Sequence, residues 1–448
     1  MPLTDWTIDS WKRYPAAQQA EYDDPEHLNR VLEQLRRLPP IVTSWEVEQL
    51  KRQIAQVGRG ERFLLQGGDC SERFADCQAH IIDAKLKVLL MMSAVLVYGG
   101  GKQVVRVGRI AGQYAKPRSS NTETRDGVTL PSYRGDLVNR IEFTPEARRP
   151  DPDRLLEAYS RSSITLNFIR SLLSGGFGDI HHPEVWDLDF VSHAERPQEY
   201  LELVDNLRSS LRFLDAMVGR PVSELARVDF FTCHEGLHLP YESAVSELPP
   251  LRDRWYLLST HFPWIGDRTR SLDGAHVEFF RGLANPMGVK VGPTMQPEEL
   301  VALIERLNPD DEPGRLTLIC RFGADKVARL LPPLIDAVQR SGRFVTWCCD
   351  PMHGNTYKTA DGTKTRHFDE ILSELDQSFE IHADAGTILG GVHFEMTGQK
   401  VTEVVGGARG LTEADLAAHY ESDVDPRLNY EQALEMAFLI ARRMAGRR

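Results

Sequence analysis

The sequence has few cysteines, little lysine and no long apolar run, and each shortage bears on a class of protein. Six cysteines in 448 residues are too few for a disulfide framework, so we predict a reducing, cytoplasmic environment. The longest apolar run, Val88 to Val97, is too short to cross a bilayer. The first residues lack a basic start followed by an apolar stretch, so no secretory signal is predicted. We therefore expect no membrane partner.

The charge balance argues against a nucleic-acid partner. The formal net charge is −12 and the pI is near 5.7, whereas a nucleic-acid-binding protein needs a basic face. Only 11 of the 53 basic residues are lysine, and the other 42 are arginine. Because lysine is this rare, a lysine at the end of a predicted strand stands out as a candidate functional residue. Small anions could still bind local basic clusters.

Strand-like runs alternate mostly with helical periodicity from residue 61 onward. Such alternation favours a parallel sheet with right-handed crossovers, and eight strands favour a closed barrel over an open sheet. We therefore predict an α/β fold, a (β/α)8 TIM barrel over residues 61–448. The predicted strands are Phe63–Gln66, Gln103–Val107, Val228–Cys233, Tyr256–Thr260, Val289–Val291, Leu316–Arg321, Phe344–Cys349 and Val392–Glu395. The predicted helices between them include His80–Tyr98, Leu272–Leu283, Pro297–Leu307, Asp325–Gln339, His367–Leu375 and Tyr430–Arg443.

Two regions extend this barrel. Residues 1–60 combine an extended arm with two amphipathic helices, the second opened by the capping box Thr43-x-x-Glu46. Their apolar stripes are buried either at an interface of a homo-oligomer, a dimer or tetramer, or across the barrel bottom. The second and third strands are separated by about 120 residues, far more than a barrel connection needs. This 110–225 region, with helices at 153–174 and 196–218 around a loop at 175–183, is expected to be regulatory or interface-forming.

Six cations lie on barrel strands or in the loops that leave them. They would repel one another on a common rim unless anionic ligands lay between them. Arginine offers two-pronged hydrogen bonds to phosphate or carboxylate, and lysine acts as a point charge. The set predicts two phosphorylated substrates, one of which also carries a carboxylate. In the alternative interpretation, several of the arginines pair with acids such as Asp267 and Glu235. The six residues are Arg109, Lys116, Arg118, Arg268, Lys290 and Arg321.

A second set combines a thiol, an imidazole and two carboxylates at the strand ends. Cys70, His353, Glu395 and Asp425 are all able to bind a metal, and a mixed S/N/O set on an open rim suggests a catalytic divalent ion. No CxxC or HExxH spacing supports the prediction. The alternative is a small buried cysteine with surface carboxylates.

Several long motifs resemble one enzyme family over essentially the whole chain. They are Trp11, Gln66-Gly-Gly-Asp-Cys70, Gly108-Arg-Ile-Ala-Gly-Gln-Tyr-Ala-Lys-Pro-Arg118-Ser, Trp264-Ile-Gly-Asp-Arg268-Thr-Arg, Asn285-Pro-Met-Gly-Val-Lys290-Val-Gly-Pro, Cys349-Asp-Pro-Met-His353-Gly-Asn-Thr and Lys364-Thr-Arg-His-Phe-Asp369. With these motifs the chain resembles the type II 3-deoxy-D-arabino-heptulosonate-7-phosphate (DAHP) synthases. The resemblance implies a transferase that joins phosphoenolpyruvate to erythrose 4-phosphate at the start of the shikimate pathway of aromatic amino acid biosynthesis.

The resemblance also implies roles for individual residues. It implies that a divalent metal, Mn²⁺ first and Co²⁺ or another ion second, is held by Cys70, His353, Glu395 and Asp425. The residues that match the phosphoenolpyruvate site are Arg109, Arg268, Lys290 and Arg321, with Trp264 and Asp267 lining it. Asp267 replaces a glutamate of some relatives, and its shorter side chain puts a direct contact in doubt. Lys116, Arg118 and Ser119 match the part that meets the aldose phosphate, and Lys364 and Glu235 are further candidates.

From the charges at the site we further predict that Arg109 and Lys290 hold the enol phosphate and that Lys116 delivers a proton to the new alkoxide, with metal-bound water as the competing donor. Feedback by aromatic amino acids is common in the family, and the N-terminal helices or the 110–225 region would be its place here. Two alternatives stay open at this point. One is a related phosphoenolpyruvate–aldose phosphate synthase with another sugar, and the other is a barrel that binds phosphometabolites without catalysis.

Overall fold

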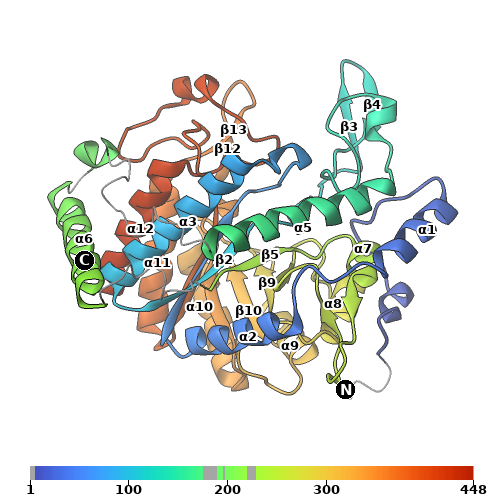
Figure 1. Cartoon of the computed structure of the whole chain (residues 1–448), viewed down its shortest axis with the longest axis horizontal. Helices are drawn as coiled ribbons and strands as arrows, with labels where there is room; N and C mark the ends of the chain where they lie inside the picture. The colour runs from blue at the N-terminus through green and yellow to red at the C-terminus, as the bar shows by residue number, and fades with distance from the viewer. Residues whose placement is uncertain (1–5, 175–188, 195–196, 219–228, 447–448) are drawn as a thin grey trace.

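A closed eight-stranded barrel forms the centre of the chain (Figure 1). The computed structural model describes residues 6–174, 189–194, 197–218 and 229–446. The barrel strands pair in parallel and in chain order, and the last strand closes against the first. They are β1 (Arg62–Gly68), β2 (Gln103–Arg109), β5 (Phe231–Glu235), β8 (Phe262–Ile265), β9 (Met287–Val291), β10 (Leu316–Cys320), β11 (Thr346–Cys349) and β14 (Leu389–Glu395). The predicted (β/α)8 fold is confirmed.

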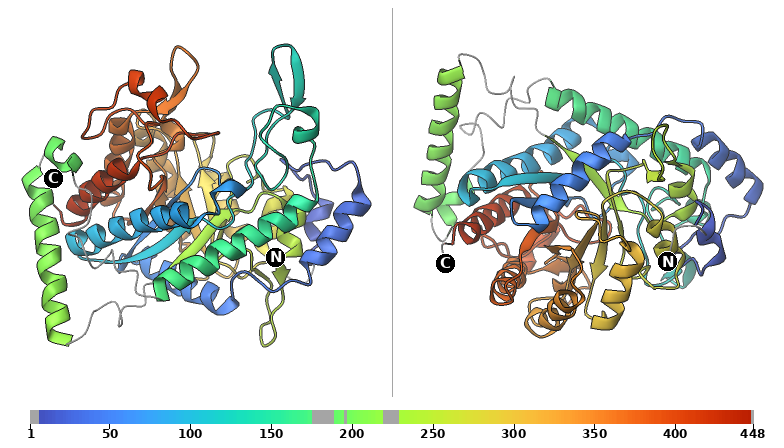
Figure 2. Two further views of the ribbon diagram at one scale, coloured as in Figure 1. Left: turned by 45° about the horizontal axis from the view of Figure 1, so that its top comes forward. Right: turned by 90° about the horizontal axis from the view of Figure 1, so that it is seen from below.

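Helices surround the barrel on its outer side (Figures 1 and 2). They include α3 (Ala79–Gly100), α7 (Leu239–Ala244), α8 (Ala275–Arg281), α9 (Pro297–Leu307), α10 (Val327–Ser341), α11 (Phe368–Asp384) and α12 (Tyr430–Met444). The apolar run from Val88 to Val97 lies within α3, which contacts β1, β2 and α12. Across the described ranges, no helix has both the length and the apolar character needed to span a bilayer.

The predicted fourth strand, Tyr256–Thr260, is wrong. Tyr256–Leu257 forms the short strand β7, which pairs with β6 (Ser246–Glu247) in a separate antiparallel pair, and the barrel strand is β8. Pro263 interrupts the apolar run of β8, and a proline argues against a central strand because it cannot donate to the ladder. The run is short enough to tolerate it, and Phe262 and Trp264 on either side belong to the core cluster inside the barrel. The predicted third strand began at Val228, which lies outside the described residues.

The two N-terminal helices bury their apolar stripes within this chain. The capping box is present, since Thr43 N donates to Glu46 Oε2 at 2.8 Å and Glu46 N donates back to the Thr43 hydroxyl. It opens α2 (Ser44–Gly58), which contacts β1, β2, β11 and β14. Residues Leu50, Ile54 and Val57 of α2 join the core cluster inside the barrel. The preceding helix α1 (Pro25–Leu35) contacts α5 and α7. This arrangement fits the barrel-bottom alternative for α2, and a subunit interface stays a prediction.

The long connection between β2 and β5 carries its own elements. They are the hairpin β3 (Thr122–Arg125) and β4 (Val128–Pro131), then α4 (Pro145–Arg148), α5 (Asp153–Ser174), the short helix Asp189–His193 and α6 (Pro197–Val218). Helix α5 has the predicted bounds, and α6 differs by one residue. Helix α6 contacts α3 at the edge of the molecule (Figure 2). The predicted loop at 175–183 lies outside the described residues.

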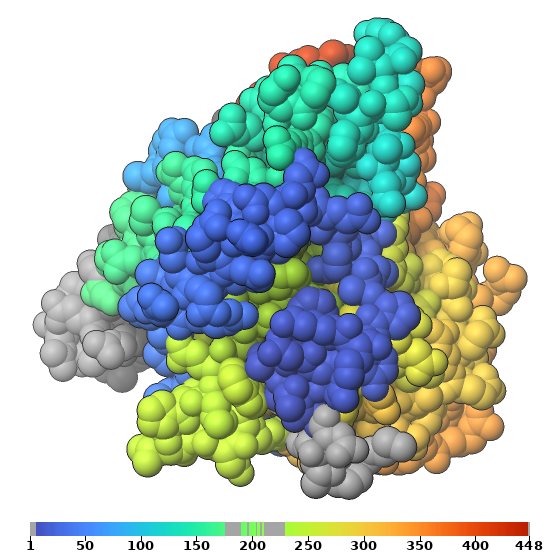
Figure 3. Space-filling model, turned by 90° about the vertical axis from the view of Figure 1, so that its right-hand side faces the viewer, coloured from blue at the N-terminus to red at the C-terminus, as the bar shows by residue number. Residues whose placement is uncertain are grey.

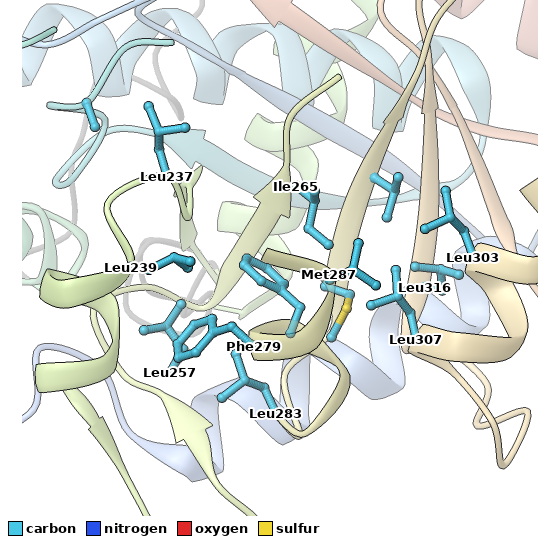
Figure 4. Close-up of a cluster of buried hydrophobic side chains, with 14 of the residues drawn as sticks. Leu237, Leu239, Leu257, Ile265, Phe279, Leu283, Met287, Leu303, Leu307 and Leu316 are labelled. Atoms are coloured by element: carbon cyan, nitrogen blue, oxygen red, sulfur yellow. The ribbon is translucent and has the colours of Figure 1, made fainter. Parts of the chain in front are cut away.

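The largest core cluster lies between the barrel and the helices that follow β5, β8 and β9 (Figure 4). Ile265 of β8, Met287 of β9 and Leu316 of β10 face side chains of α8 and α9 in this cluster. The packing fixes the strands, and with them the loops at their carboxyl ends.

Candidate active site

A cavity of about 180 Å³ lies at the carboxyl ends of the barrel strands. It is lined by Cys70, Arg109, Gln113, Lys116, Pro117, Glu235, Trp264, Gly266, Asp267, Arg268, Lys290, Arg321, His353 and Asp425. Eleven of these are among the predicted site residues, and together they lie in or after all eight barrel strands. Sites in TIM barrels form at this face because each strand delivers a loop to the same rim.

Cys70, Lys116 and Asp425 form the polar centre of the cavity. The Lys116 ammonium lies 2.6 Å from Cys70 Sγ and 2.8 Å from Asp425 Oδ2. Burial disfavours charge on Lys116, yet Asp425 and Cys70 raise its pKa above the ordinary value. Burial raises the pKa of the Cys70 thiol, and the charge of Glu395 adds to this effect. The thiol therefore ionises only with help from further positive charge.

Glu395 and His353 adjoin this centre. His353 Nε2 lies 3.0 Å from Glu395 Oε1, and His353 Nδ1 lies 2.8 Å from Asp350 Oδ2. Although burial favours a neutral carboxyl, His353 and Arg366 hold the pKa of Glu395 well below its usual range. Asp350 fixes one ring nitrogen of His353 and leaves the other facing Glu395.

The donor set fits a divalent cation. Ligand atoms of Cys70, Glu395 and Asp425 all lie within 4.8 Å of one another, and His353 contacts Glu395. Sulfur, nitrogen and oxygen donors together suit a transition metal better than Mg²⁺ or Ca²⁺. A carboxylate beside the second nitrogen is a common supporting contact of metal-binding histidines, and Asp350 makes such a contact with His353.

The predicted cations reach the cavity already paired with groups of the chain. Arg109 donates to Glu395 Oε1 at 3.2 Å and to the Asp69 carbonyl at 2.9 Å. Lys290 bonds to Asp350, and burial lowers its pKa. The Trp264 ring lies 5.3 Å from the Arg109 guanidinium and 5.8 Å from the Lys290 ammonium. Cations close to an aromatic face gain an electrostatic attraction that holds them in place.

Arg321 and Arg268 line the same wall with different surroundings. Arg321 lies 3.4 Å from Asp267 Oδ2 and donates to the His353 carbonyl at 3.2 Å. The pairing with Asp267 is one that the alternative interpretation predicted. Arg268 is exposed and has no hydrogen bond or ion pair within the part of the chain that the structure describes. It is therefore free to meet an anion.

Glu235 is the buried acid of the cavity. Burial raises its pKa, although the charges of Lys116 and Lys290 act in the opposite direction. Its Oε1 has no hydrogen-bond partner among the described residues. A Cβ at Gly266 would lie 2.1 Å from that oxygen, so this position needs glycine for the carboxyl group to fit.

Four predicted residues lie outside the lining of the cavity. Glu395 is fully buried and contacts Arg109 and His353 of the lining. Lys364 reaches it through Asp425 Oδ1, 3.0 Å away. Arg118 turns to Glu123 in the neighbouring hairpin, at 2.8 Å, and Ser119 is exposed beside it.

Sequence reasoning missed several residues that support the site. Asp350, Arg366 and Gln113 all lie inside the long motifs, which was the available signal. Gln113 Oε1 accepts from the Glu235 backbone N–H at 2.9 Å. His393 lies inside the barrel, where burial holds its pKa well below the ordinary value, so the neutral ring accepts a hydrogen bond from Arg109 at 2.7 Å.

Comparison with known proteins agrees with the resemblance. Residues 6–441 match the model of the class-II DAHP synthetase family. A Neurospora crassa protein named phospho-2-dehydro-3-deoxyheptonate aldolase is 48% identical over 452 residues, covering 97% of this chain and 94% of the relative. A Streptomyces coelicolor protein of the same name is 49% identical over 432 residues, covering 96% of both. Phospho-2-dehydro-3-deoxyheptonate aldolase AroG of Mycolicibacterium smegmatis is 46% identical over 448 residues, covering 98% of this chain and 96% of the relative. With its sequence, its barrel and its strand-end motifs in agreement, this chain belongs to the class-II DAHP synthetase family.

Proposed function

We propose that this chain performs the reaction of its family in the cavity described above. Phosphoenolpyruvate and erythrose 4-phosphate condense with water to give DAHP and inorganic phosphate, the first step of the shikimate pathway. The condensation follows from family membership. One observation supports its assignment to this cavity: five cations line it beside Cys70 and Asp425.

A divalent ion is proposed to be held by Cys70, His353, Glu395 and Asp425. Mn²⁺ is our first choice, and Co²⁺ or another divalent ion is the alternative. Three observations favour this set: the donor atoms of Cys70, Glu395 and Asp425 lie close together, His353 contacts Glu395, and Asp350 contacts the second ring nitrogen of His353. When bound, the ion supplies Lewis-acid polarisation of the aldehyde oxygen of erythrose 4-phosphate.

The phosphate and carboxylate of phosphoenolpyruvate are proposed to bind Arg109, Arg268, Lys290 and Arg321. Trp264 limits the motion of Arg109 and Lys290. Asp267 acts through Arg321, which it contacts, and not on the ligand. Groups held in advance by packing and hydrogen bonds keep a reactant in near-attack geometry without further ordering at the moment of reaction.

Lys116, Arg118 and Ser119 are proposed to meet erythrose 4-phosphate, together with Lys364 and Glu235. Carbon 3 of phosphoenolpyruvate attacks the aldehyde carbon and leaves cationic character at carbon 2. Water adds there, and the hemiketal phosphate then releases inorganic phosphate. Lys116 keeps its proton because Asp425 and Cys70 favour the charged form over the effect of burial, and it delivers that proton to the new alkoxide.

The chain is further proposed to form a homo-oligomer in a cytoplasmic setting. Trp45 of α2 is 72% exposed and Leu251 fully exposed, and the Arg252 guanidinium lies 4.4 Å from the Trp45 ring. Two large exposed apolar side chains in one region contribute to an apolar patch, and such patches mark interaction surfaces, which supports an interface near the N-terminal helices. Sedimentation as a monomer at micromolar concentration would contradict it. Free thiols at all six cysteines support a reducing compartment. Aromatic amino acids remain the proposed effectors, tested by inhibition of turnover.

The decisive experiment measures phosphate release with both substrates, with and without a chelator. We expect turnover with erythrose 4-phosphate and little with arabinose 5-phosphate, and we expect loss on chelation with recovery on adding Mn²⁺. Cys70→Ser should abolish the metal-dependent turnover. Cys77→Ser is the matched control, since Cys77 lies outside the cavity lining. Full activity of the chelated enzyme would refute the metal assignment, and a preference for the five-carbon sugar would refute the substrate.

A further inference from the structure

The N-terminal arm between the first short helix (Ser10–Arg13) and α1 binds the start of α8 and two of the loops that form the cavity. Ala275, the first residue of α8, donates its backbone N–H to the Pro15 carbonyl at 3.0 Å. The chain then reaches the loops after β2 and β5. Figure 3 shows the dark-blue N-terminal segment lying on the surface between the teal segment that follows β2 and the yellow-green segments that follow it in the chain.

Gln18 binds the loop that follows β2. Its Oε1 accepts from the Arg118 backbone N–H at 2.8 Å, and its Nε2 donates to the Arg118 carbonyl at 3.1 Å. The carboxamide thus pairs with both backbone groups of one residue. The Gln18 carbonyl also accepts from Arg134 at 3.2 Å, and the Arg134 carbonyl accepts from Lys116 N at 2.9 Å. Both cations of this loop are therefore tied to the arm.

Gln19 binds the loop that follows β5 in the same way. Its Oε1 accepts from Leu239 N at 3.0 Å, and its Nε2 donates to the Leu237 carbonyl at 2.8 Å. Leu237 comes two residues after Glu235. Tyr22 adds a contact between its hydroxyl and His238 Nε2 at 2.9 Å. Two adjacent glutamines therefore join two strand-end loops that lie more than 100 residues apart in the chain.

The backbone at Gln18 is in an uncommon conformation. Its φ is +64°, the left-handed region that residues other than glycine enter rarely. Such conformations persist where the surrounding contacts hold them, and they occur often beside functional sites. The four hydrogen bonds made by the two side chains to the loops supply that hold.

We propose that Gln18 and Gln19 are positioning residues that set the spacing between the loop of Lys116 and Arg118 and the loop of Glu235. Neither glutamine lines the cavity, so each acts through the loop that it binds. This inference rests on the proposed function, in which these two loops meet erythrose 4-phosphate. The N-terminal arm would then control how well the aldose phosphate is placed, and the phosphoenolpyruvate groups Lys290, on β9, and Arg321, directly after β10, would be unaffected.

The kinetic test uses Gln18→Gly and Gln19→Ala in the Mn²⁺-loaded full-length protein. Because glycine adopts a φ of +64° without strain, Gln18→Gly removes the carboxamide and adds no strain to the backbone. A misplaced loop costs catalysis steeply, so we expect kcat/KM for erythrose 4-phosphate to fall about ten- to a hundredfold. The KM for phosphoenolpyruvate should stay within about twofold. In Gln18→Glu, which keeps the acceptor for Arg118 N, kcat/KM for erythrose 4-phosphate should fall less than in Gln18→Gly.

Gln339→Ala is the matched control, because Gln339 donates to the Ala385 carbonyl at 2.9 Å, away from the cavity. Hydrogen exchange of ligand-free protein gives a readout that needs no turnover. Peptides covering Arg118 and Leu239 should exchange faster in the two variants and not in the control. If wild-type protein shows no turnover, the proposed function fails and exchange alone decides whether the glutamines hold the loops. Unchanged exchange, or equal changes in KM for both substrates, would overturn the proposal.

Discussion

Replacing Asp350 by asparagine tests whether one buried carboxylate positions both Lys290, proposed to bind phosphoenolpyruvate, and His353, proposed to bind the metal. Asp350 is fully buried at the end of β11 and binds the Lys290 ammonium and His353 Nδ1. Although burial favours its neutral form, His353 and Lys290 hold its pKa well below the ordinary value. Asparagine keeps the size and removes the charge, and it leaves the ammonium of Lys290, a residue that is only 5% exposed, without its carboxylate. Breaking a buried pair from one side costs about 3–5 kcal/mol.

The substitution should also weaken the binding of phosphoenolpyruvate and of Mn²⁺. The pKa of Lys290 is already lowered by burial and would fall further without the carboxylate, which weakens its hold on an anion. His353 would lose the partner that orients its ring, and such losses typically reduce metal affinity about 10- to 100-fold. Asp350→Asn should therefore lower stability, Mn²⁺ affinity and phosphoenolpyruvate affinity together.

Urea unfolding and calorimetric titration with Mn²⁺ would measure these effects. The control is Asp336→Asn on α10, where the acid is 64% exposed and pairs with Arg340, which is 72% exposed. A surface pair of this kind contributes about 0–1 kcal/mol. If Asp350→Asn cost no more than the control and left Mn²⁺ affinity unchanged, other groups would have to hold Lys290 and His353, and the reasoning would be refuted.

Three further predictions follow from single positions. In Gly266→Ala, the added Cβ would lie 2.1 Å from Glu235 Oε1. We therefore expect thermal unfolding to show about 1–3 kcal/mol of destabilisation and kcat/KM to fall at least tenfold. Wild-type stability and activity would contradict this packing. Thr43→Ala removes the capping box of α2 and should cost about 1 kcal/mol in urea unfolding without changing KM, and a changed KM would link α2 to the site. Burial raises the pKa of Glu374 to about 7, so its stabilising contribution is present below its ordinary value of 4.5 and is lost as the pH rises through 7. Between pH 5 and pH 8, the free energy of unfolding of Glu374→Gln should therefore rise relative to that of wild type by up to about 3 kcal/mol. A difference in unfolding free energy that does not change with pH would refute the raised pKa.

The barrel could be predicted because the apolar pattern of most strands and helices is strong. Helices α5 and α9 have the predicted bounds, since their apolar positions recur at helical spacing and the start of α9 carries a proline that favours it. The fourth strand was mispredicted because Pro263 weakens the signal of β8 and the apolar run at Tyr256–Leu258 is continuous. Local pattern alone could not show that tertiary packing selects the interrupted run.

The membership of the site could be predicted from strand ends, but its internal pairing could not. Parallel strands bring their carboxyl ends to one rim, which is why Cys70 and His353 line the same cavity. The pairing of Lys290 with Asp350 depends on the register between β9, β10 and β11, which sequence spacing does not give. Arg118 was predicted as a site residue, but its guanidinium forms an ion pair with Glu123 of the neighbouring hairpin, and strand-end position alone could not reveal this pairing.

The pairing changes how anion binding at this rim has to be understood. Repulsion among the cations, taken alone, would require a bound anion for the site to be stable. In the structure, carboxylates of the chain already relieve it, with Glu395 beside Arg109, Asp350 beside Lys290 and Asp267 beside Arg321. A phosphorylated substrate must therefore share or displace these acids, so orientation of the paired cations matters more than their number. Arg268, with no such partner in the described residues, is the cation at which an arriving phosphate gains most, because binding there breaks no existing pair.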